Sequence, residues 1–366
     1  MRGIWGKNII LSIFGESHGS AIGIVIGGLP PGLSLDFELI NRELARRAPG
    51  WNNLTSQRRE RDEIEILSGY FNNRTTGTPL CGIIRNKDSK PEDYKEIKNL
   101  IRPGHGDYTG HIKYKGFNDY RGGGHFSGRL TAPIVFGGAI AKQILMKRNI
   151  AIGSHIKSIL DIEDRSFNKI SVEEELILDL AARHFPVLDE DQGRKMEKII
   201  SQVRKEGDSV GGTIETAIIN VPVGLGEPFF HSVESRLSQM MFSIPSVKAI
   251  EFGIGFDMGN AKGSQVKDEY IIKDGKIKTL ENHNGGIVGG LSNGMPIIFT
   301  IALKPTPSIG LTQKTVNIES MEEVEINIKG RHDPCILPRA IPVVEGGTAL
   351  VILDLLIEME GRSWMN

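Results

Sequence analysis

Cysteine is scarce in this chain. Only two cysteines, Cys81 and Cys335, occur in 366 residues, and they stand far apart in the sequence. A pair of this kind has no metal-ligand spacing and gives no disulfide framework. The scarcity therefore excludes a cysteine zinc site and a disulfide-stabilised scaffold, and it favours a reducing, cytoplasmic environment.

The sequence also lacks long apolar runs and an excess of charge of one sign. No uninterrupted apolar stretch has the length of about 20 residues that a membrane-spanning helix needs, and the first residues contain no secretory apolar segment. The formal net charge is −1, so no global field attracts nucleic acid or an anionic membrane. We therefore expect a soluble protein whose ion-binding sites are local.

Aromatic residues are few, whereas glycine is abundant. The six tyrosines form no stripe with basic residues, which counts against a module that binds RNA or phosphorylated ligands through basic loops. The 44 glycines are clustered between apolar segments rather than scattered through low-complexity sequence. Such clusters are typical of loops that approach a ligand and of elements that pack closely.

Apolar periodicity and turn residues predict alternating strands and helices. Asp36 is a candidate N-cap for a helix over 37–47, and a helix begins near Thr131. Further helices are predicted after a capping box at 171–174, stopped by Pro186, and over 190–206, 229–248 and 342–360. Strands are predicted over 8–14 and 23–28, twice within 64–85, within 207–228 and over 296–304. No linker separates these elements, so we expect a single domain over 1–366.

Two of the predicted helices carry paired glycines in their interiors. The pairs are Gly137-Gly138 and Gly346-Gly347. Each glycine costs roughly 1 kcal/mol of helix stability relative to alanine. Our hypothesis is that the two helices cross at these pairs, backbone against backbone, in a core between sheets.

The stretch from Arg102 to Lys142 contains the most suggestive chemistry. It opens with Arg102 and His105 around a Pro-Gly turn, crosses the triple glycine 122–124 and enters an apolar helix. A glycine-rich turn before a helix is weak evidence of an anion site when taken alone. Earlier in the chain, Ser17 and His18 follow a strand, but neighbours on extended backbone point to opposite sides. A hydrolase that uses them as nucleophile and base is therefore disfavoured.

Eight motifs in order resemble those of the chorismate synthase family. They are GESHG at 15–19, RRAPG at 46–50, RPGHGDYT at 102–109, DYRGGGHFSGRLTA at 119–132, SIPSVKAIEFG at 243–253, NGGIVGGLSNG at 284–294, KPTPSI at 304–309 and GRHDPCILPRAIPVVE at 330–345. The resemblance covers essentially the whole chain. It implies an α+β fold, a β-α-β sandwich with long central helices between two antiparallel sheets, and a homotetramer.

The resemblance also implies a reaction. The family removes the 3-phosphate and a C6 proton from 5-enolpyruvylshikimate 3-phosphate, an anti-1,4 elimination that gives chorismate in the last step of the shikimate pathway. Reduced FMN is required without net redox change, and NAD(P)H would serve only as the upstream reductant. Three catalytic residues are implied. His18 matches the proton donor to phosphate, His105 the histidine near flavin N1, and Asp333 the acid that works with flavin N5 in removing the C6 proton.

The implied binding residues suit an anionic substrate and an anionic reduced flavin. Arginines make bidentate, charge-assisted contacts with carboxylates and phosphates. The implied substrate-binding residues are Ser17, Arg47, Arg102, Ser127, Arg129 and Arg331. The implied cofactor-binding residues are Arg47, His125, Phe126, Ser127, Pro245, Ser246, Gly289, Lys304, Pro305, Thr306, Pro307, Ser308 and Arg331. No metal site is expected.

Three segments depart from the family pattern. Many members have Arg-Ser-Ser where this chain has His125, Phe126 and Ser127, an arginine where it has Asn53, and a glutamate where it has Leu130. Asn53 weakens any assignment of nicotinamide nucleotide binding, so we expect dependence on an external flavin reductase. Two alternatives stay open: a flavin-dependent oxidoreductase with net electron transfer, and a catalytically silent relative. The first would need a hydride source, but no GxGxxG motif opens a βαβ unit.

Overall fold

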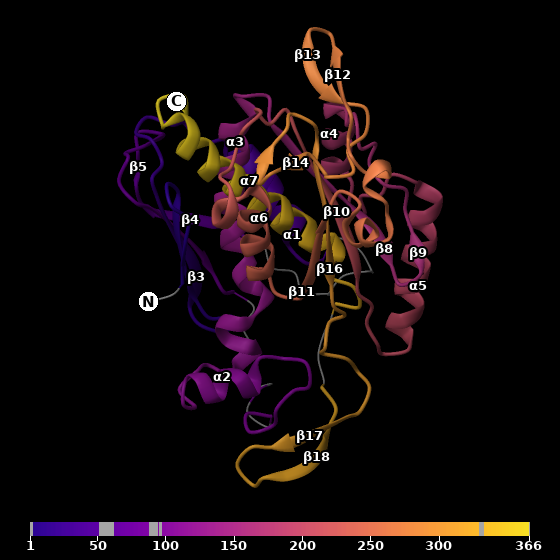
Figure 1. Cartoon of the computed structure of the whole chain (residues 1–366). Coiled ribbons are helices and arrows are strands. Elements are labelled where there is room, and N and C mark those ends of the chain that lie inside the picture. Colours follow the sequence, from indigo (N-terminus) through magenta and orange to yellow (C-terminus); the bar gives the residue numbers. More distant parts are fainter. Residues whose placement is uncertain (1–2, 51–61, 88–93, 95–96, 329–332, 366) are drawn as a thin grey trace.

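The computed structural model describes residues 3–50, 62–87, 94, 97–328 and 333–365 (Figure 1). Asn53 and Arg331 lie outside the described residues, so the predictions that concern them are not taken further. The described chain contains two five-stranded antiparallel sheets with long helices between them. The α+β sandwich predicted from the sequence is confirmed.

The first sheet is formed by the N-terminal quarter of the chain. Its strand order is β1-β2-β3-β7-β4, with bounds Ile4–Trp5, Ile10–Gly15, Ala21–Gly27, Leu80–Arg85 and Ile64–Ser68. Ile22, Ile24 and Ile26 occupy every second position of β3, so all three turn toward the core and are at most 1% exposed. This face covers the central helices.

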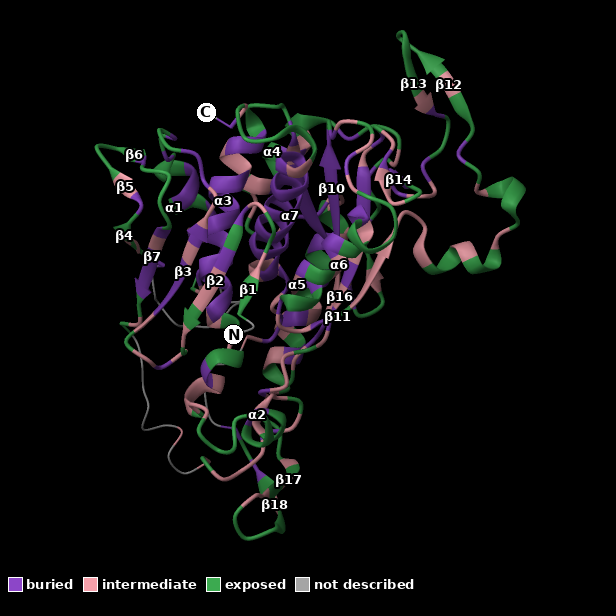
Figure 2. Cartoon of the chain, turned by 60° about the vertical axis from the view of Figure 1, so that its left-hand side comes forward, coloured by how far each residue is buried: buried purple, intermediate pink, exposed green. Residues whose placement is uncertain are grey.

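The second sheet is formed by residues from the middle and the later part of the chain. Its order is β11-β16-β10-β8-β9, with bounds Val247–Phe252, Ile297–Leu303, Gly212–Ile219, Ala151–Ile159 and Ile162–Glu163. Both β8 and β10 are buried along most of their length, which places this sheet between two helical layers. Figure 2 shows the buried residues concentrated in the two sheets and the helices between them.

The central layer contains α3 (Ala132–Met146) and α7 (Leu337–Glu360), flanked by α1 (Phe37–Arg47) and α6 (Val233–Ser243). The helices α4 (Glu174–Ala182) and α5 (Glu190–Lys205) lie on the outer side of the second sheet (Figure 1). The short α2 (Asp107–Lys113) lies outside both sheets. By length and composition α7 could cross a membrane, but its most apolar window is completely buried, as the core helix of a soluble protein requires.

The described residues also form four two-stranded hairpins. They are β5-β6 (Tyr70–Phe71, Arg74–Thr75), β12-β13 (Tyr270–Lys273, Lys276–Thr279), β14-β15 (Ile287–Val288, Leu291–Ser292) and β17-β18 (Gln313–Asn317, Glu322–Ile326). Figure 1 shows β12-β13 and β17-β18 projecting at opposite ends of the molecule.

The predicted close crossing of the glycine-bearing helices is confirmed for one glycine of each pair. A Cβ added at Gly138 would lie 2.2 Å from the Cα of Gly346, so α3 and α7 touch through their backbones. Gly137 instead faces Ile24 and Ile26 of the first sheet, and Gly347 faces Met240 of α6. The two glycine pairs therefore permit three close contacts: α3 with α7, α3 with the first sheet, and α7 with α6.

Several predicted helix boundaries are wrong. Ser171 does not cap a helix, because its hydroxyl bonds to the Glu173 carboxylate and α4 begins at Glu174. The helix predicted over 229–248 is shorter: Ser232 caps α6 and strand β11 begins at Val247. The last helix begins at Leu337, so Pro342 lies inside it, one turn after the Pro338 that opens it.

The glycine contact gives a direct test of packing. We expect Gly138→Ala to lower the free energy of unfolding by roughly 1–3 kcal/mol, because the added methyl overpacks the crossing. Urea unfolding measures the change. Gly259→Ala is the matched control, since a Cβ at Gly259 meets no heavy atom within 4 Å, and its effect should stay within about 0.5 kcal/mol. Equal effects of the two substitutions would contradict the crossing.

A buried histidine in the second sheet sits between two carboxylates. The His155 side chain is fully buried, and its ring nitrogens lie 3.0 Å from an Asp164 oxygen and 2.9 Å from a Glu215 oxygen. Burial alone would lower the pKa of His155, but hydrogen bonds to Asp164 and Glu215 outweigh burial and raise it. Folding therefore favours the protonated form of His155.

The raised pKa makes the contribution of His155 to stability depend on pH. It is fully present below the unfolded histidine pKa of about 6.5 and is lost as pH rises through the higher folded pKa. We expect His155→Gln to destabilise the protein more at about pH 6 than at about pH 9, measured by urea unfolding. The exposed His231 provides the control through His231→Gln. An equal loss at both pH values would show that the charge of His155 does not matter.

Candidate functional site

A cavity of about 460 Å³ lies where four helices of the central layer present their ends. Thr131, the residue just before α3, and the first two turns of α7 line it, as do the last residue of α1 and the turn after α6. The loops over 102–107, 122–131 and 304–308 close the remaining sides. Because the N-terminal ends of α3 and α7 both open here, their dipoles favour an anion in the cavity.

Basic side chains dominate the polar lining. Five of them contribute, along with the imidazole of His105: Arg47, Arg102, Arg129, Lys304 and Arg339. Two carboxylates, Asp107 and Asp333, also line the cavity. The protein as a whole has almost no net charge, so the local excess of cations marks a site for a multiply charged anion.

Asp62 holds two of these arginines together. Its buried carboxylate accepts a hydrogen bond of 2.7 Å from Arg47 Nη1, and Arg129 Nη1 donates to its other oxygen. Arg47 is fixed further by Thr131 Oγ1 at 3.3 Å and the Gly128 carbonyl at 3.1 Å. Burial by itself would raise the pKa of Asp62, but Arg47 and Arg129 outweigh burial and lower it. Asp62 therefore remains a carboxylate that orders both guanidinium groups.

The 102–107 loop is fixed by contacts within itself and with the 304–308 segment. Arg102 makes a bidentate pair with Asp107, with Nε and Nη2 distances of 2.7 and 2.8 Å. His105 Nε2 lies 2.7 Å from Ser308 Oγ. Lys304 Nζ donates to the Gly104 carbonyl at 2.6 Å. The predicted substrate residue Arg102 and the predicted catalytic His105 are thus brought into one wall of the cavity.

His18 lies behind the glycine turn rather than on the lining itself. It is buried, and a Cβ at Gly122 would lie 2.3 Å from its Nδ1 and 3.1 Å from Ser17 Oγ. The Tyr94 ring meets the His18 imidazole edge-on, with ring centroids 4.9 Å apart. Tyr94 also lines a neighbouring cavity of about 240 Å³, which shares Arg102 and Gly123 with the first. Gly122, which lines the main cavity, therefore lies directly against His18.

Most of the predicted cofactor residues lie in the same place. Eight of them line the cavity beside Arg47: Phe126, Ser127, Pro245, Ser246, Lys304, Thr306, Pro307 and Ser308. Phe126 packs over Gly106 and Gly110, where a Cβ would come within 3.2 and 2.7 Å of its ring. His125 is exposed, and its Nδ1 lies 2.9 Å from the Gly15 carbonyl. The arrangement confirms that segments far apart in sequence meet here.

Three predicted cofactor residues in the described part of the chain do not line the cavity, and the exposed His125 is one of them. Pro305 packs beside Gly211 instead, and Gly289 lies in the turn between β14 and β15. The neighbouring Gly290 accepts a hydrogen bond from Val233, at the start of α6, whereas the turn at the other end of α6 lines the cavity. The 11 residues of α6 therefore separate Gly289 from the cavity by about 16 Å.

Three residues at the site were missed by reasoning from the sequence. Asp107 and Arg339 stand inside motifs that were noticed for other residues. Asp62 belongs to the mixed-sign run at 57–65, which is more typical of a solvated surface, yet its side chain is fully buried. A buried carboxylate requires cationic partners, and this requirement is the signal that could have identified Asp62 as a site residue.

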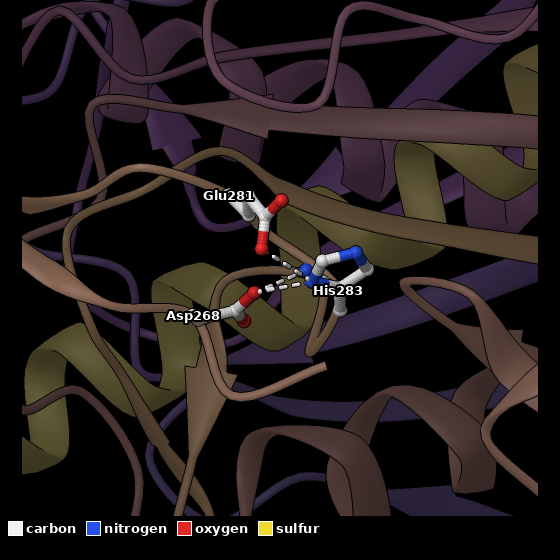
Figure 3. Close-up of side chains that lie close together, drawn as sticks. All are labelled: Asp268, Glu281 and His283. Atoms are coloured by element: carbon white, nitrogen blue, oxygen red, sulfur yellow. Dashed lines mark hydrogen bonds and ion pairs between the residues drawn. The ribbon is translucent and has the colours of Figure 1, made fainter. Parts of the chain in front are cut away.

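A separate group of possible metal ligands lies outside the cavity. Figure 3 shows Asp268, Glu281 and His283 close together. The Asp268 carboxylate accepts hydrogen bonds from the backbone and side chain of both His283 and Asn284, at 2.7–3.0 Å. These hydrogen bonds give Asp268 a structural role, because they hold the loop at 283–284 in place.

Asp62 provides the test of the arginine arrangement. We expect Asp62→Asn to lower the free energy of unfolding at neutral pH by roughly 3–5 kcal/mol, because two buried guanidinium groups lose their counter-charge. The pKa of Asp62 is lower in the folded protein than the unfolded value of about 3.9. The stability that its carboxylate contributes is therefore lost only as pH falls below the unfolded value and through the folded pKa. Glu65→Gln breaks an exposed pair with Arg85 and should cost at most about 1 kcal/mol in the same unfolding experiment.

If Asp62→Asn costs no more than Glu65→Gln, the buried carboxylate does not organise the arginines.

Comparison with known proteins agrees with the geometry. The family model described as "Chorismate synthase" matches residues 9–357. Chorismate synthase of Pyrococcus abyssi is 48% identical over 352 residues, covering 96% of this chain and 97% of that protein. That of Thermococcus kodakarensis is 45% identical over 359 residues, covering 98% of each. A solved crystal structure of chorismate synthase matches with a TM-score of 0.75 and 30% identity, covering 98% of this chain and 94% of that one.

Proposed function

Because this chain belongs to the chorismate synthase family, and is thus a carbon–oxygen lyase of the shikimate pathway, we propose that it works with reduced FMN and without net redox change. The substrate is 5-enolpyruvylshikimate 3-phosphate, which carries two carboxylates and a phosphate. The observation that carries the proposal is the convergence of five basic side chains and two helix N-termini on one cavity. Such a site suits a substrate with several negative groups.

The reaction breaks the C6–H bond and the C3–O bond to phosphate. The C6–H electrons form a new double bond to C1, and the C1=C2 double bond shifts to C2–C3 as phosphate leaves. Atoms and electrons balance without any oxidant. Arg47, Arg102 and Arg129 hold the anionic groups and stabilise the charge that gathers on the departing phosphate.

Two residues of the chain manage the protons. His18 donates a proton to the departing phosphate past Gly122, whose lack of a side chain keeps that path short. Asp333 lines the cavity at the start of α7 and receives the C6 proton. We also assign Ser17 to orientation of the substrate beside His18.

The cavity fits a flavin. Thr306 Oγ1 lines it, is buried and has no hydrogen-bond partner among the described residues, so it can serve the ligand. The backbone at Gly123 leaves room for a planar ring, because a Cβ added there would meet nothing nearer than Arg102 Nη2 at 3.8 Å. His105, Phe126, Pro245, Ser246, Lys304 and Ser308 would hold the group. When bound, reduced FMN supplies an electron that promotes phosphate departure and then recovers it.

We further propose a cytoplasmic homotetramer that receives reduced flavin from an external reductase. The two cysteines are both free thiols, which suits a reducing compartment. NAD(P)H enters this scheme only upstream, as the electron source for the flavin.

The proposal is tested by anaerobic turnover. Purified protein with substrate and dithionite-reduced FMN should release phosphate and chorismate in equal amounts, whereas oxidised FMN should give neither. His18→Ala should lower kcat roughly 10²–10⁴-fold, because it removes the positioned proton donor to phosphate. His105→Ala should also lower kcat, because it removes an imidazole that would hold the reduced flavin. His231→Ala, on an exposed histidine away from the cavity, should leave the rate unchanged.

Stoichiometric consumption of reduced flavin would instead show a net oxidoreductase. Binding of substrate and FMN without turnover would show a silent relative.

A further inference from the structure

Arg339 holds the Asp333 carboxylate against the cavity wall. It is the third residue of α7, and its Nη1 donates to Asp333 Oδ2. The exposed fractions of the two side chains are 19% and 14%, so the pair is largely shielded from water yet open to the cavity that both residues line. A shielded charge-assisted pair of this kind has a fixed geometry.

The same guanidinium also reaches another element. Arg339 Nε donates to the backbone carbonyl of Arg47 at 3.0 Å. Arg47 is the last residue of α1, where carbonyl groups lack partners within the helix. Its side chain meanwhile pairs with Asp62. Arg339 thus links the turn that carries Asp333 to the helix end that carries an anion-binding arginine.

We propose that Arg339 is a positioning residue for proton abstraction, acting through Asp333; this inference rests on the proposed function. The fork of the guanidinium holds Asp333 and the Arg47 carbonyl at once, which sets the distance between the base and the bound anionic groups. A lysine at this position has one point-like ammonium group and cannot reproduce both directed bonds. The residue acts on the step that breaks the C6–H bond, and the proton passes to Asp333.

The test compares turnover of normal substrate and substrate deuterated at C6, with reduced FMN. We expect Arg339→Gln to lower kcat by about 10–100-fold, because misplacement of a reacting group by about 1 Å has effects of this size. The deuterium effect on kcat should rise above that of the wild type, since C6–H cleavage becomes slower relative to the other steps. KM and the affinity for oxidised FMN, measured by fluorescence, should change less than about twofold. For Arg339→Lys, both kcat and the deuterium effect should fall between those of the wild type and Arg339→Gln.

A matched control separates positioning from folding. Arg236 is also buried, and it forms an ion pair with Asp354. Asp354 lies far along α7 from the cavity. Arg236→Gln should lower the melting temperature without changing the deuterium effect. In a double-mutant cycle, Arg339→Gln should have little further effect once Asp333→Asn is present, because the residue acts through that carboxylate.

Other outcomes overturn the inference. A wild-type kcat and deuterium effect in Arg339→Gln would do so, as would a rise in KM alone, which would make Arg339 a substrate-binding residue. If Arg339→Gln does not fold, Arg339→Lys provides the test. A wild-type deuterium effect in Arg339→Lys would contradict the proposal. Absence of turnover by the wild-type protein would instead refute the proposed function.

Discussion

The backbone contact between α3 and α7 is the constraint on which the rest of the structure depends. Gly138 meets Gly346 so closely that any side chain would separate the helices. Because both helices begin at the cavity, their separation sets the distance between the 122–131 loop and the turn at Asp333. The two sheets then cover these helices, and the largely buried α7 acts as the axis of the core. Packing in the core thus determines the spacing of groups in the site.

The charged side chains of the site are also held in fixed positions. Each cavity arginine is oriented by an acid or a carbonyl: Asp62 holds Arg47 and Arg129, Asp107 holds Arg102, and Asp333 meets Arg339. Paired in this way, the cations are fixed before a ligand arrives, so little conformational entropy is lost on binding. The positive ends of α3 and α7 add to the field. Such preorganisation is the main means by which a site of this kind stabilises developing negative charge.

The resemblance to a known family implied the α+β sandwich and placed His105, Arg47, Arg102 and Arg129 in one site, and the structure brings these residues together. The sequence itself predicted the helix crossing, but not which glycine of each pair would touch. Neighbouring helical residues point about 100° apart, so the choice depends on tertiary packing. The start of α7 was missed because Pro338 and Pro342 can each open a helix. Asp62 was missed because its burial is decided by arginines distant in sequence. Gly289 stays a prediction: within one chain α6 lies between it and the cavity, and a motif does not reveal the length of that helix.

The measurement that tests the central claim most directly is the number of chorismate molecules formed per flavin reduced. FMN is reduced once by a known amount of dithionite under anaerobic conditions, and a large excess of substrate is then added to the protein. The account predicts many turnovers for each reduced flavin, with phosphate and chorismate equal throughout and the flavin still reduced at the end. A single turnover for each reduced flavin, with the flavin left oxidised, would contradict it.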